Sequence, residues 1–292
     1  MKICMTAEEL GREPTIQLGR GMRLGLVPTM GALHEGHLSL VRAARQKSDQ
    51  VVVSIFVNPA QFGPGEDLAS YPRNFERDRD LLEKEGVDIL FAPTVEEMYP
   101  RGATTWVEVA GLSGKLDGRS RPGHFRGVTT VVSKLFHIMA PQTAFFGQKD
   151  AAQLAIIRQM TRDLKFPIEI IACPIVREQD GLAMSSRNSY LNPEERQQAL
   201  ALHRSLETVK KSWLAGESDP QSLIHAGRQV IAAAPGTKLD YFEIVDANGL
   251  DPVHKAGVGS LVAVAAFIGT TRLIDNVLLG SDQDIHTANA QN

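Results

Sequence analysis

Residues 24–37 read LGLVPTMGALHEGH, and this stretch determines the fold that the sequence predicts. The apolar run Leu24–Val27 is typical of a buried strand, and it passes through a glycine-containing turn into the start of a helix. Gly31 and Gly36 allow the backbone to turn sharply and to approach a ligand closely. The helix that follows directs its N–H groups and its positive dipole end at that ligand, so the stretch predicts a phosphate-binding turn.

Two histidines belong to the same turn. His34 and His37 lie three residues apart, so both imidazoles can face one anion. The pattern is neither GxGxxG nor a Walker loop, because no Gly-Lys-Ser/Thr follows. Two other interpretations remain open: half of a zinc site, which lacks further ligands nearby, and a helix start that is simply capped.

The alternation of strands and helices continues to about residue 175. The other strand candidates are 51–57, 87–91, 144–146 and 168–172, and the helical patterns are 37–47, 75–85, 128–139 and 150–163. This order predicts an α/β fold, a Rossmann-like doubly wound parallel sheet with ligands at the carboxyl ends of its strands. We expect this domain to occupy residues 1–176.

The pattern then changes to that of a smaller α+β domain. Asn192-Pro193-Glu194-Glu195 combines an N-cap, a proline at the first helical position and acidic residues in the first turn. Helices are expected to about 214 and over 220–233, and strands over 239–246, 260–268 and 273–277. We expect a hinge at 177–191, with a Met-Ser-Ser-Arg loop, a C-terminal domain at 192–292 and a frayed polar tail from Asp282.

Charge and cysteine content limit the possible functions. The chain has 292 residues, with 31 Lys+Arg against 34 Asp+Glu, and the net charge of −3 argues against a nucleic-acid or anionic-membrane partner. Cys4 and Cys173 are far apart, which excludes a disulfide scaffold and fits a reducing compartment. No apolar run approaches 18 residues and residues 1–10 lack a secretory pattern, so we expect a soluble, cytoplasmic protein.

Two further motifs follow strands of the first domain. Asn58 and Gln61, after the strand at 51–57, are neutral amides suited to a carboxylate or a hydroxyl, although Asn-Pro can equally form a simple turn. Residues 118–128 read GRSRPGHFRGV, with three arginines and a histidine spaced by glycines. This loop could bind phosphates, reach a partner subunit or lie in solvent.

The last two motifs lie at 146–150 and 184–188. Lys149 is a mobile charge for phosphate oxygens, Asp150 is a plausible N-cap, and Gln153 lies one helical turn further on. Met184-Ser185-Ser186-Arg187-Asn188 offers two hydroxyls and a guanidinium at the domain boundary. It could close on a triphosphate, or it could be a plain linker.

Together these motifs resemble the class I aminoacyl-tRNA synthetase and nucleotidylyltransferase superfamily, in which a His-x-Gly-His turn and a later Met-Ser-Ser-Arg loop clamp the phosphates of ATP. The longer strings are similar to the pantothenate synthetase (pantoate–β-alanine ligase) family, in the same order and over essentially the whole chain. These strings are 28–37, 56–62, 121–125, 146–150 and 184–188.

The resemblance implies an ATP-dependent, AMP-forming ligase. Pantoate reacts with ATP to give pantoyl adenylate and pyrophosphate, and β-alanine then displaces AMP to give pantothenate. The ATP site it implies comprises Met30, Gly31, Ala32, Leu33, His34, Glu35, Gly36, His37, Gly147, Gln148, Lys149, Asp150, Val176, Met184, Ser185, Ser186 and Arg187. The catalytic residues it implies are His37 as proton donor, with His34, Lys149, Ser185, Ser186 and Arg187 as donors to the triphosphate.

The resemblance also implies the remaining ligands and the assembly. Gln61 would contact pantoate and β-alanine, Gln153 would contact pantoate, and Asn58 would lie nearby. Mg²⁺ would accompany ATP near Asp78, held mainly through phosphates and water, and the protein would be a homodimer.

One departure and two alternatives accompany this interpretation. The family usually carries two successive glutamines after Lys-Asp, whereas here Ala151-Ala152-Gln153 follows. Because the adenylate hydrolyses readily, the site must exclude water, and Met184–Asn188 with the smaller domain is the expected lid. The alternatives are a nucleotidylyltransferase acting on another small carboxylate or phosphate substrate, and a catalytically silent nucleotide-binding module.

Overall fold

The computed structural model describes residues 1–13 and 22–280, and its internal contacts divide the chain into two compact units. The first comprises Met1–Gln148 and Ile156–Val176, and the second comprises Lys149–Ala155 and Arg177–Asn292. The first unit therefore differs from the continuous range 1–176, because residues 149–155 group with the second. The expected hinge at 177–191 also groups with the second unit, and the polar tail from Asp282 lies outside the described residues.

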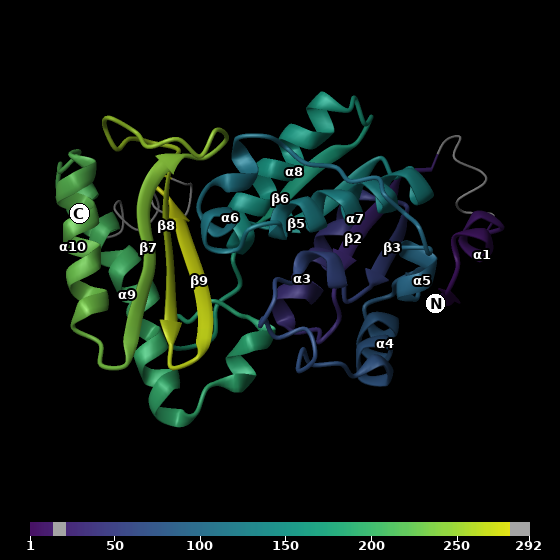
Figure 1. Ribbon diagram of the computed structural model, residues 1–292, viewed down its shortest axis with the longest axis horizontal. Coiled ribbons are helices and arrows are strands. Elements are labelled where there is room, and N and C mark those ends of the chain that lie inside the picture. The colour runs from purple at the N-terminus through teal and green to yellow at the C-terminus, as the bar shows by residue number, and fades with distance from the viewer. Residues whose placement is uncertain (14–21, 281–292) are drawn as a thin grey trace. The chain divides into compact units, whose positions relative to one another are not determined.

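A six-stranded parallel sheet forms the centre of the first unit (Figure 1). The strand order is β1-β4-β3-β2-β5-β6. The bounds are β1 (Lys2–Cys4), β2 (Leu24–Thr29), β3 (Gln50–Ile55), β4 (Ile89–Phe91), β5 (Thr143–Gly147) and β6 (Glu169–Cys173). In the interior of the sheet Leu26 lies opposite Val52 on one side and Ala144 on the other. The predicted α/β fold is confirmed.

Helices cover both faces of this sheet. The connections through α3 (Glu35–Lys47) and α4 (Phe75–Lys84) step along the sheet in one direction, and those through α7 (His124–Met139) and α8 (Ala151–Asp163) step in the other. Because such crossovers are right-handed, the two pairs of helices lie on opposite faces. The order reverses beside β2, so the carboxyl end of β2 is the switch point at which open α/β sheets bind ligands.

The apolar core under α3 and α4 explains why the strands are continuous apolar runs. Val27, Leu40, Val41, Leu82 and Phe145 belong to one buried cluster on this side of the sheet. Strands buried on both faces need apolar side chains in both directions, which is the pattern that the sequence shows.

Several short elements were not expected from the sequence. They are β1, α1 (Ala7–Gly11), α5 (Val95–Met98), α6 (Asp117–Ser120) and the 3₁₀ helices η1 (Pro59–Gln61), η2 (Leu112–Gly114), η3 (Gln148–Asp150) and η4 (Ser186–Tyr190). In residues 1–13 and 22–280, no helix combines the length and the apolar character needed to span a membrane.

The second unit is built on an antiparallel sheet with two helices packed against it. Its strands β7 (Thr237–Asp246), β8 (Ser260–Ile268) and β9 (Thr271–Leu278) are adjacent in that order, and α9 (Pro193–Leu214) and α10 (Pro220–Ala232) contact them (Figure 1). Asn192 caps α9 as predicted, since its Oδ1 accepts from Glu195 N at 2.9 Å. The expected smaller α+β domain is confirmed.

Candidate active site

The turn between β2 and α3 places the predicted residues Met30–His37 at the switch point of the sheet. Gly31 and Ala32 both adopt positive φ angles, 79° and 51°. Asp78 of α4 holds this backbone: Oδ2 accepts from Ala32 N at 2.7 Å and Oδ1 accepts from Leu33 N at 2.9 Å. A Cβ atom at position 31 would lie 3.0 Å from Asp78 Oδ2, so glycine permits the close approach.

His34 and His37 lie at the first turn of α3 with their ring centroids 4.1 Å apart. His34 Nδ1 accepts from Gly36 N at 3.1 Å, and His37 Nδ1 accepts from His34 N at 3.3 Å. Because a backbone amide can only donate, each neutral ring carries its proton on Nε2. The two histidines thus cap the helix and also provide Nε2–H donors at its positive end, where a phosphate would be stabilised.

Asp78 is committed to the turn rather than to a preformed metal site. It is 1% exposed, and its two oxygens accept the two loop amides. Across the part of the chain that the structure describes, no group of three or more His, Cys, Asp or Glu side chains is arranged to hold a metal ion. The zinc interpretation of His34 and His37 thus finds no further ligand among residues 1–13 and 22–280, and a Mg²⁺ ion near Asp78 stays a prediction.

The turn after β3 brings the two predicted amides to the same end of the sheet. Asn58 is 1% exposed, and its Nδ2 donates to Gln61 Oε1 at 3.0 Å and to Gly127 O at 3.1 Å. Gln61 Nε2 in turn lies 3.2 Å from the Sδ atom of Met30. Residues predicted from two separate motifs, after β2 and after β3, are therefore in contact.

Helix α7 packs directly against this turn at Gly127. A Cβ atom at that position would lie 2.2 Å from Ala60 O and 2.6 Å from Gln61 N. Only glycine allows the helix to approach the turn so closely, and the approach makes Gly127 O available to Asn58.

The arginine-containing loop is attached to the same turn. His124 Nδ1 lies 2.7 Å from Gln61 O and Arg121 Nη1 lies 3.1 Å from His124 Nε2, so the ring donates through Nδ1 and accepts through Nε2. Arg121 also forms a two-point ion pair with Glu66, at 2.8 and 2.6 Å. Burial and the neighbouring Arg121 charge lower the pKa of His124 to about 4, which keeps the ring neutral. His124 thus holds the backbone carbonyl of Gln61, and Arg121 holds the His124 ring in place.

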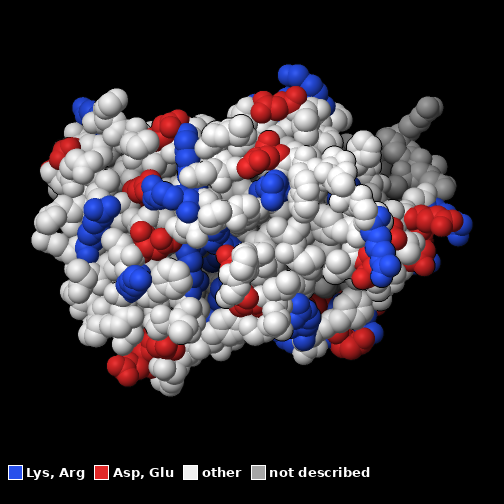
Figure 2. Space-filling view, in the orientation of Figure 1, with Lys and Arg blue, Asp and Glu red and all other residues white. Residues whose placement is uncertain are grey.

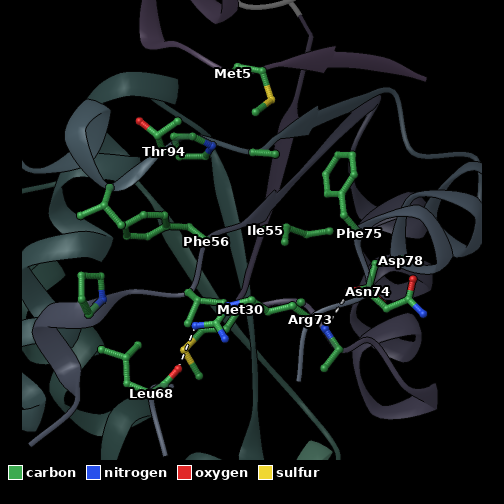
Figure 3. Close-up of a pocket in the computed structure, with 17 residues that line it drawn as sticks. Met5, Met30, Ile55, Phe56, Leu68, Arg73, Asn74, Phe75, Asp78 and Thr94 are labelled. Carbon is green, nitrogen blue, oxygen red and sulfur yellow. Dashed lines mark hydrogen bonds between the residues drawn. The ribbon is translucent and has the colours of Figure 1, made fainter. Parts of the chain in front are cut away.

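A cavity of about 540 Å³ opens at the carboxyl ends of β2, β3 and β4 (Figure 3). Of the predicted site residues, Met30, Gly31, Ala32 and Asp78 line it. Further lining residues come from the N-terminus and from the end of β3, namely Met5, Ile55, Phe56, Val57 and Pro59. The remaining ones lie within 68–75 and 92–95, which no motif indicated because they contribute mainly apolar side chains. Within these segments Arg73 donates to the carbonyl oxygens of Leu68 and Tyr71, at 2.8 and 2.9 Å.

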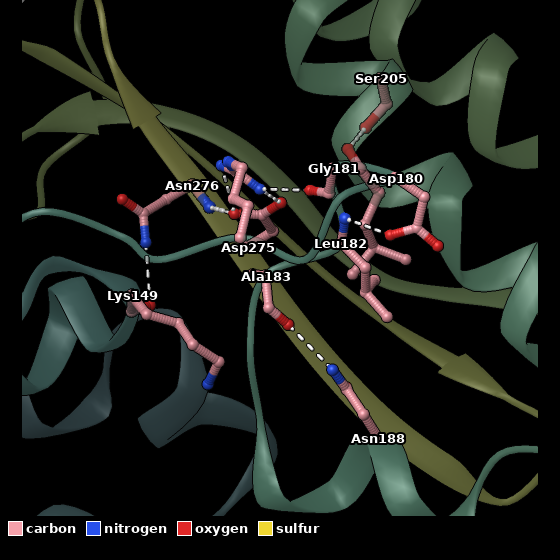
Figure 4. A network of polar contacts seen from close by, with 11 residues as sticks. Lys149, Asp180, Gly181, Leu182, Ala183, Asn188, Ser205, Asp275 and Asn276 are labelled. Carbon is pink, nitrogen blue, oxygen red and sulfur yellow. Dashed lines mark hydrogen bonds and ion pairs between the residues drawn. The ribbon is translucent and has the colours of Figure 1, made fainter. Parts of the chain in front are cut away.

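In the second unit, β9 holds the backbone of Lys149. Asn276 Nδ2 donates to Lys149 O at 2.8 Å (Figure 4). The adjacent Asp275 is 2% exposed, binds Arg177 at 2.7 and 3.0 Å, and accepts from Asn276 N at 2.8 Å. Arg177 also donates to Gly181 O at 3.1 Å, so β9 fixes the chain that leads into the Met-Ser-Ser-Arg segment.

The Met-Ser-Ser-Arg segment is itself an organised turn. Ser185 caps η4 by accepting from Arg187 N at 3.3 Å. Asn188 Nδ2 donates to Ala183 O at 3.1 Å (Figure 4). It also donates to Glu178 Oε1 at 2.8 Å, and the two contacts close the loop. These contacts favour a built loop over the plain linker that the sequence left open.

The remaining predicted residues divide between the two units. Gly147, Gln148 and Val176 belong to the first, whereas Lys149, Asp150, Gln153 and Met184–Arg187 belong to the second.

Ala152, which replaces a glutamine of the family pattern, is 2% exposed, whereas Gln153 is half-buried. On the face seen in Figure 2 positive and negative side chains are interspersed.

A family model and individual relatives both match this chain to the same family. The sequence model of the pantoate-beta-alanine ligase family matches residues 2–278. A pantothenate synthetase of Koribacter versatilis is 65% identical over 259 residues, 89% of each chain, and one of Thermotoga petrophila is 57% identical over 280 residues, 96% of this chain and 100% of that one.

Solved structures agree over nearly the full length. The pantothenate synthetase of Thermus thermophilus matches with a TM-score of 0.90 at 47% identity, covering 95% of this chain and 99% of that chain. The pantoate-beta-alanine ligase of Francisella tularensis, solved in complex with beta-gamma ATP and β-alanine, matches with a TM-score of 0.77 at 33% identity, covering 95% and 97%.

Proposed function

The chain belongs to the pantoate-beta-alanine ligase family, and we propose that its loops after β2 and β3 activate pantoate with ATP. The protein is an ATP-dependent ligase that forms pantothenate. A carboxylate oxygen of pantoate bonds to the α-phosphorus of ATP as the bond to the bridging oxygen breaks and pyrophosphate leaves. The β-alanine amine then bonds to the acyl carbon, AMP leaves with that carboxylate oxygen, and the amine loses a proton.

The histidine turn is assigned to the phosphates. His34 and His37 would donate from Nε2 to triphosphate oxygens, and His37 would supply the proton to the departing pyrophosphate. The support is the pair of amide contacts that leaves both protons on Nε2, at the positive end of a 13-residue helix. Residues Met30–Gly36 would line the nucleotide. Donors aimed at developing charge are the main contribution a protein makes to this class of transfer.

The neutral amides are assigned to the organic substrates. Gln61 would bind pantoate and β-alanine, Gln153 would bind pantoate, and Asn58 would support Gln61. The contact between Asn58 and Gln61 supports the last assignment. Neutral donors suit a carboxylate that must remain nucleophilic, because a full positive charge would stabilise it in the ground state.

The second unit is assigned to the triphosphate and to water exclusion. Lys149, Ser185, Ser186 and Arg187 would bind phosphate oxygens, and the unit would serve as the lid during the reaction. The list of ATP contacts would be completed by Gly147, Gln148, Asp150, Val176 and Met184. The support is chemical, since ammonium, hydroxyl and guanidinium groups are phosphate donors, and the loop at 184–188 is organised by its own hydrogen bonds.

Three further features belong to the proposal. Mg²⁺ would bind mainly through the triphosphate and water and would neutralise phosphate charge, since Asp78 already uses both oxygens on loop amides. The family resemblance supports a homodimer. Free, buried Cys4 and Cys173 fit a cytoplasmic location.

The observation that carries the proposal is the histidine turn at the switch point in a chain matched to the family over residues 2–278. Its test uses pantoate labelled with ¹⁸O in the carboxylate. If the adenylate forms, AMP released in the presence of β-alanine carries one labelled oxygen. Unlabelled AMP, or a stable adenylylated product indifferent to β-alanine, would contradict the proposal and favour a nucleotidylyltransferase.

A further inference from the structure

Tyr99 lies outside every motif, yet its hydroxyl reaches the amide that holds Gln61. Tyr99 Oη donates to Asn58 Oδ1 at 2.9 Å. Its ring stacks on Trp106, with centroids 6.4 Å apart, and Lys134 Nζ lies 5.0 Å from the ring centroid. Lys134 Nζ is fixed by donating to Met98 O at 2.7 Å, so the ring is held on more than one side.

The direction of each hydrogen bond at Asn58 is determined by its partners. Gly127 O can only accept, so the atom facing it at 3.1 Å is Nδ2, and Ala60 N can only donate, so the atom facing it at 3.3 Å is Oδ1. Tyr99 must therefore donate to Oδ1. Burial raises the pKa of Tyr99 to about 12, which keeps this proton in place at neutral pH.

The orientation of the Asn58 amide also determines the orientation of the Gln61 amide. Asn58 Nδ2 faces Gln61 at 3.0 Å, so the Gln61 atom there is Oε1 and the amide turns Nε2 toward Met30. The partner of Nε2 is then a thioether sulfur, which is a weak acceptor. A carboxylate or hydroxyl oxygen would be a far better partner for this N–H group than the sulfur is.

We propose that Tyr99 is a positioning residue for the substrate site: through Asn58 it holds Gln61 so that an N–H donor, and not a carbonyl oxygen, faces the substrate. Gln61 then recognises oxygen atoms of pantoate and the carboxylate of β-alanine through Nε2, while its Oε1 is engaged by Asn58 Nδ2. The inference rests on the proposed role of Gln61 as a substrate ligand.

The first test replaces Tyr99 by phenylalanine, which keeps the ring and removes the hydroxyl. Pantoate binding to the full-length protein is measured by calorimetry with a non-hydrolysable ATP analogue present, so that loss of turnover does not obscure it. Tyr99→Phe is expected to raise the Kd of pantoate about 3- to 10-fold, the range for one hydrogen bond, and to leave the Kd of the ATP analogue unchanged. The control Trp106→Phe alters the packing of the same ring and is expected to change neither value more than about twofold.

The second test is a double-mutant cycle with Gln61→Ala. If Tyr99 acts through Gln61, Tyr99→Phe has little further effect on pantoate binding in the Gln61→Ala background. Full additivity, or an unchanged Kd in the single Tyr99→Phe variant, would overturn the inference while leaving the role of Gln61 intact. If Gln61→Ala alone left pantoate and β-alanine binding unchanged, both the role of Gln61 and the inference would be wrong.

Discussion

Asp78 determines the shape of the histidine turn although it lies 45 residues further along the chain than Leu33. A loop with positive φ at Gly31 and Ala32 exposes amides that no strand or helix satisfies. The carboxylate accepts two of them and is itself hidden from solvent. A residue that the family resemblance associates with Mg²⁺ thus has a clear structural task.

This assignment predicts different results for two substitutions at position 78. Asp78→Ala leaves two inward-facing amides without acceptors, and the free energy of unfolding should fall by about 2–4 kcal/mol in urea titrations. Asp78→Asn retains one acceptor and should lose less. If the main task of Asp78 were to bind Mg²⁺, both variants would keep normal stability and would need more Mg²⁺ for full activity.

The lowered pKa of His124 predicts how the free energy of unfolding depends on pH. Its pKa is lowered from 6.5 to about 4 by burial and by Arg121, so between these values the unfolded chain binds a proton that the folded chain does not. The stabilisation is present above pH 6.5 and is lost as the pH falls, by up to about 3 kcal/mol. Urea titrations from pH 7 to pH 4 should show a shallower decline for His124→Gln than for the wild type.

A matched control separates His124 from the general effect of acid. His254 is exposed, and His254→Gln should follow the wild-type pH dependence. An identical decline in the wild type and in both variants would contradict the assignment of a neutral, half-buried His124.

At the scale of elements, the sequence predicted the parts that depend on local pattern. The strands of the first sheet from β2 onward and the long helices appear within a few residues of the expected ranges, because buried strands and amphipathic helices each leave a periodic signal. β1 was missed because it has three residues and is a strand only through its pairing with β4. Helix α7 begins at His124 rather than at 128, since Pro122-Gly123 reads as a loop while Gly123 is in fact its N-cap.

In the candidate site, too, the sequence indicated the residues that stand in local motifs and missed those brought together only by folding. His34, His37, Asn58 and Gln61 stand in short motifs at strand ends, where ligands bind in such sheets. Tyr99 carries no motif, and its relation to Asn58, 41 residues earlier, exists only in the folded chain.

The close approach of α7 to the turn after β3 gives a prediction at this scale. Gly127→Ala places a methyl group 2.2 Å from Ala60 O, so the helix and the turn must separate. The displacement of Gln61 should lower kcat/KM for pantoate about 10- to 100-fold, with a loss of about 1–3 kcal/mol in stability. Steady-state kinetics and thermal unfolding measure the two effects.

Gly114→Ala is the matched control for this variant. No atom lies within 4 Å of a Cβ built at Gly114, so activity should stay within about twofold of the wild type. Equal kinetics for the wild type, Gly127→Ala and Gly114→Ala would show that α7 does not position the turn.

At the scale of the whole molecule, the order of motifs along the chain did not predict how residues group. Lys149 follows β5 directly, yet it belongs to the second unit, where Asn276 lies 127 residues later and binds its carbonyl oxygen. The net charge excludes only a general attraction for anions. With a net charge of −3 and charges of both signs interspersed on the visible face, the proposed triphosphate site depends on local donors and helix ends.

The central claim is that the histidine turn activates pantoate with ATP, and pantoate-dependent exchange of labelled pyrophosphate into ATP tests it most directly. In the absence of β-alanine, the wild type should exchange label only when pantoate is present, and His37→Ala should lower the rate about 10²- to 10³-fold. Exchange that is indifferent to pantoate, or that proceeds at the wild-type rate in a folded His37→Ala protein, would contradict the account.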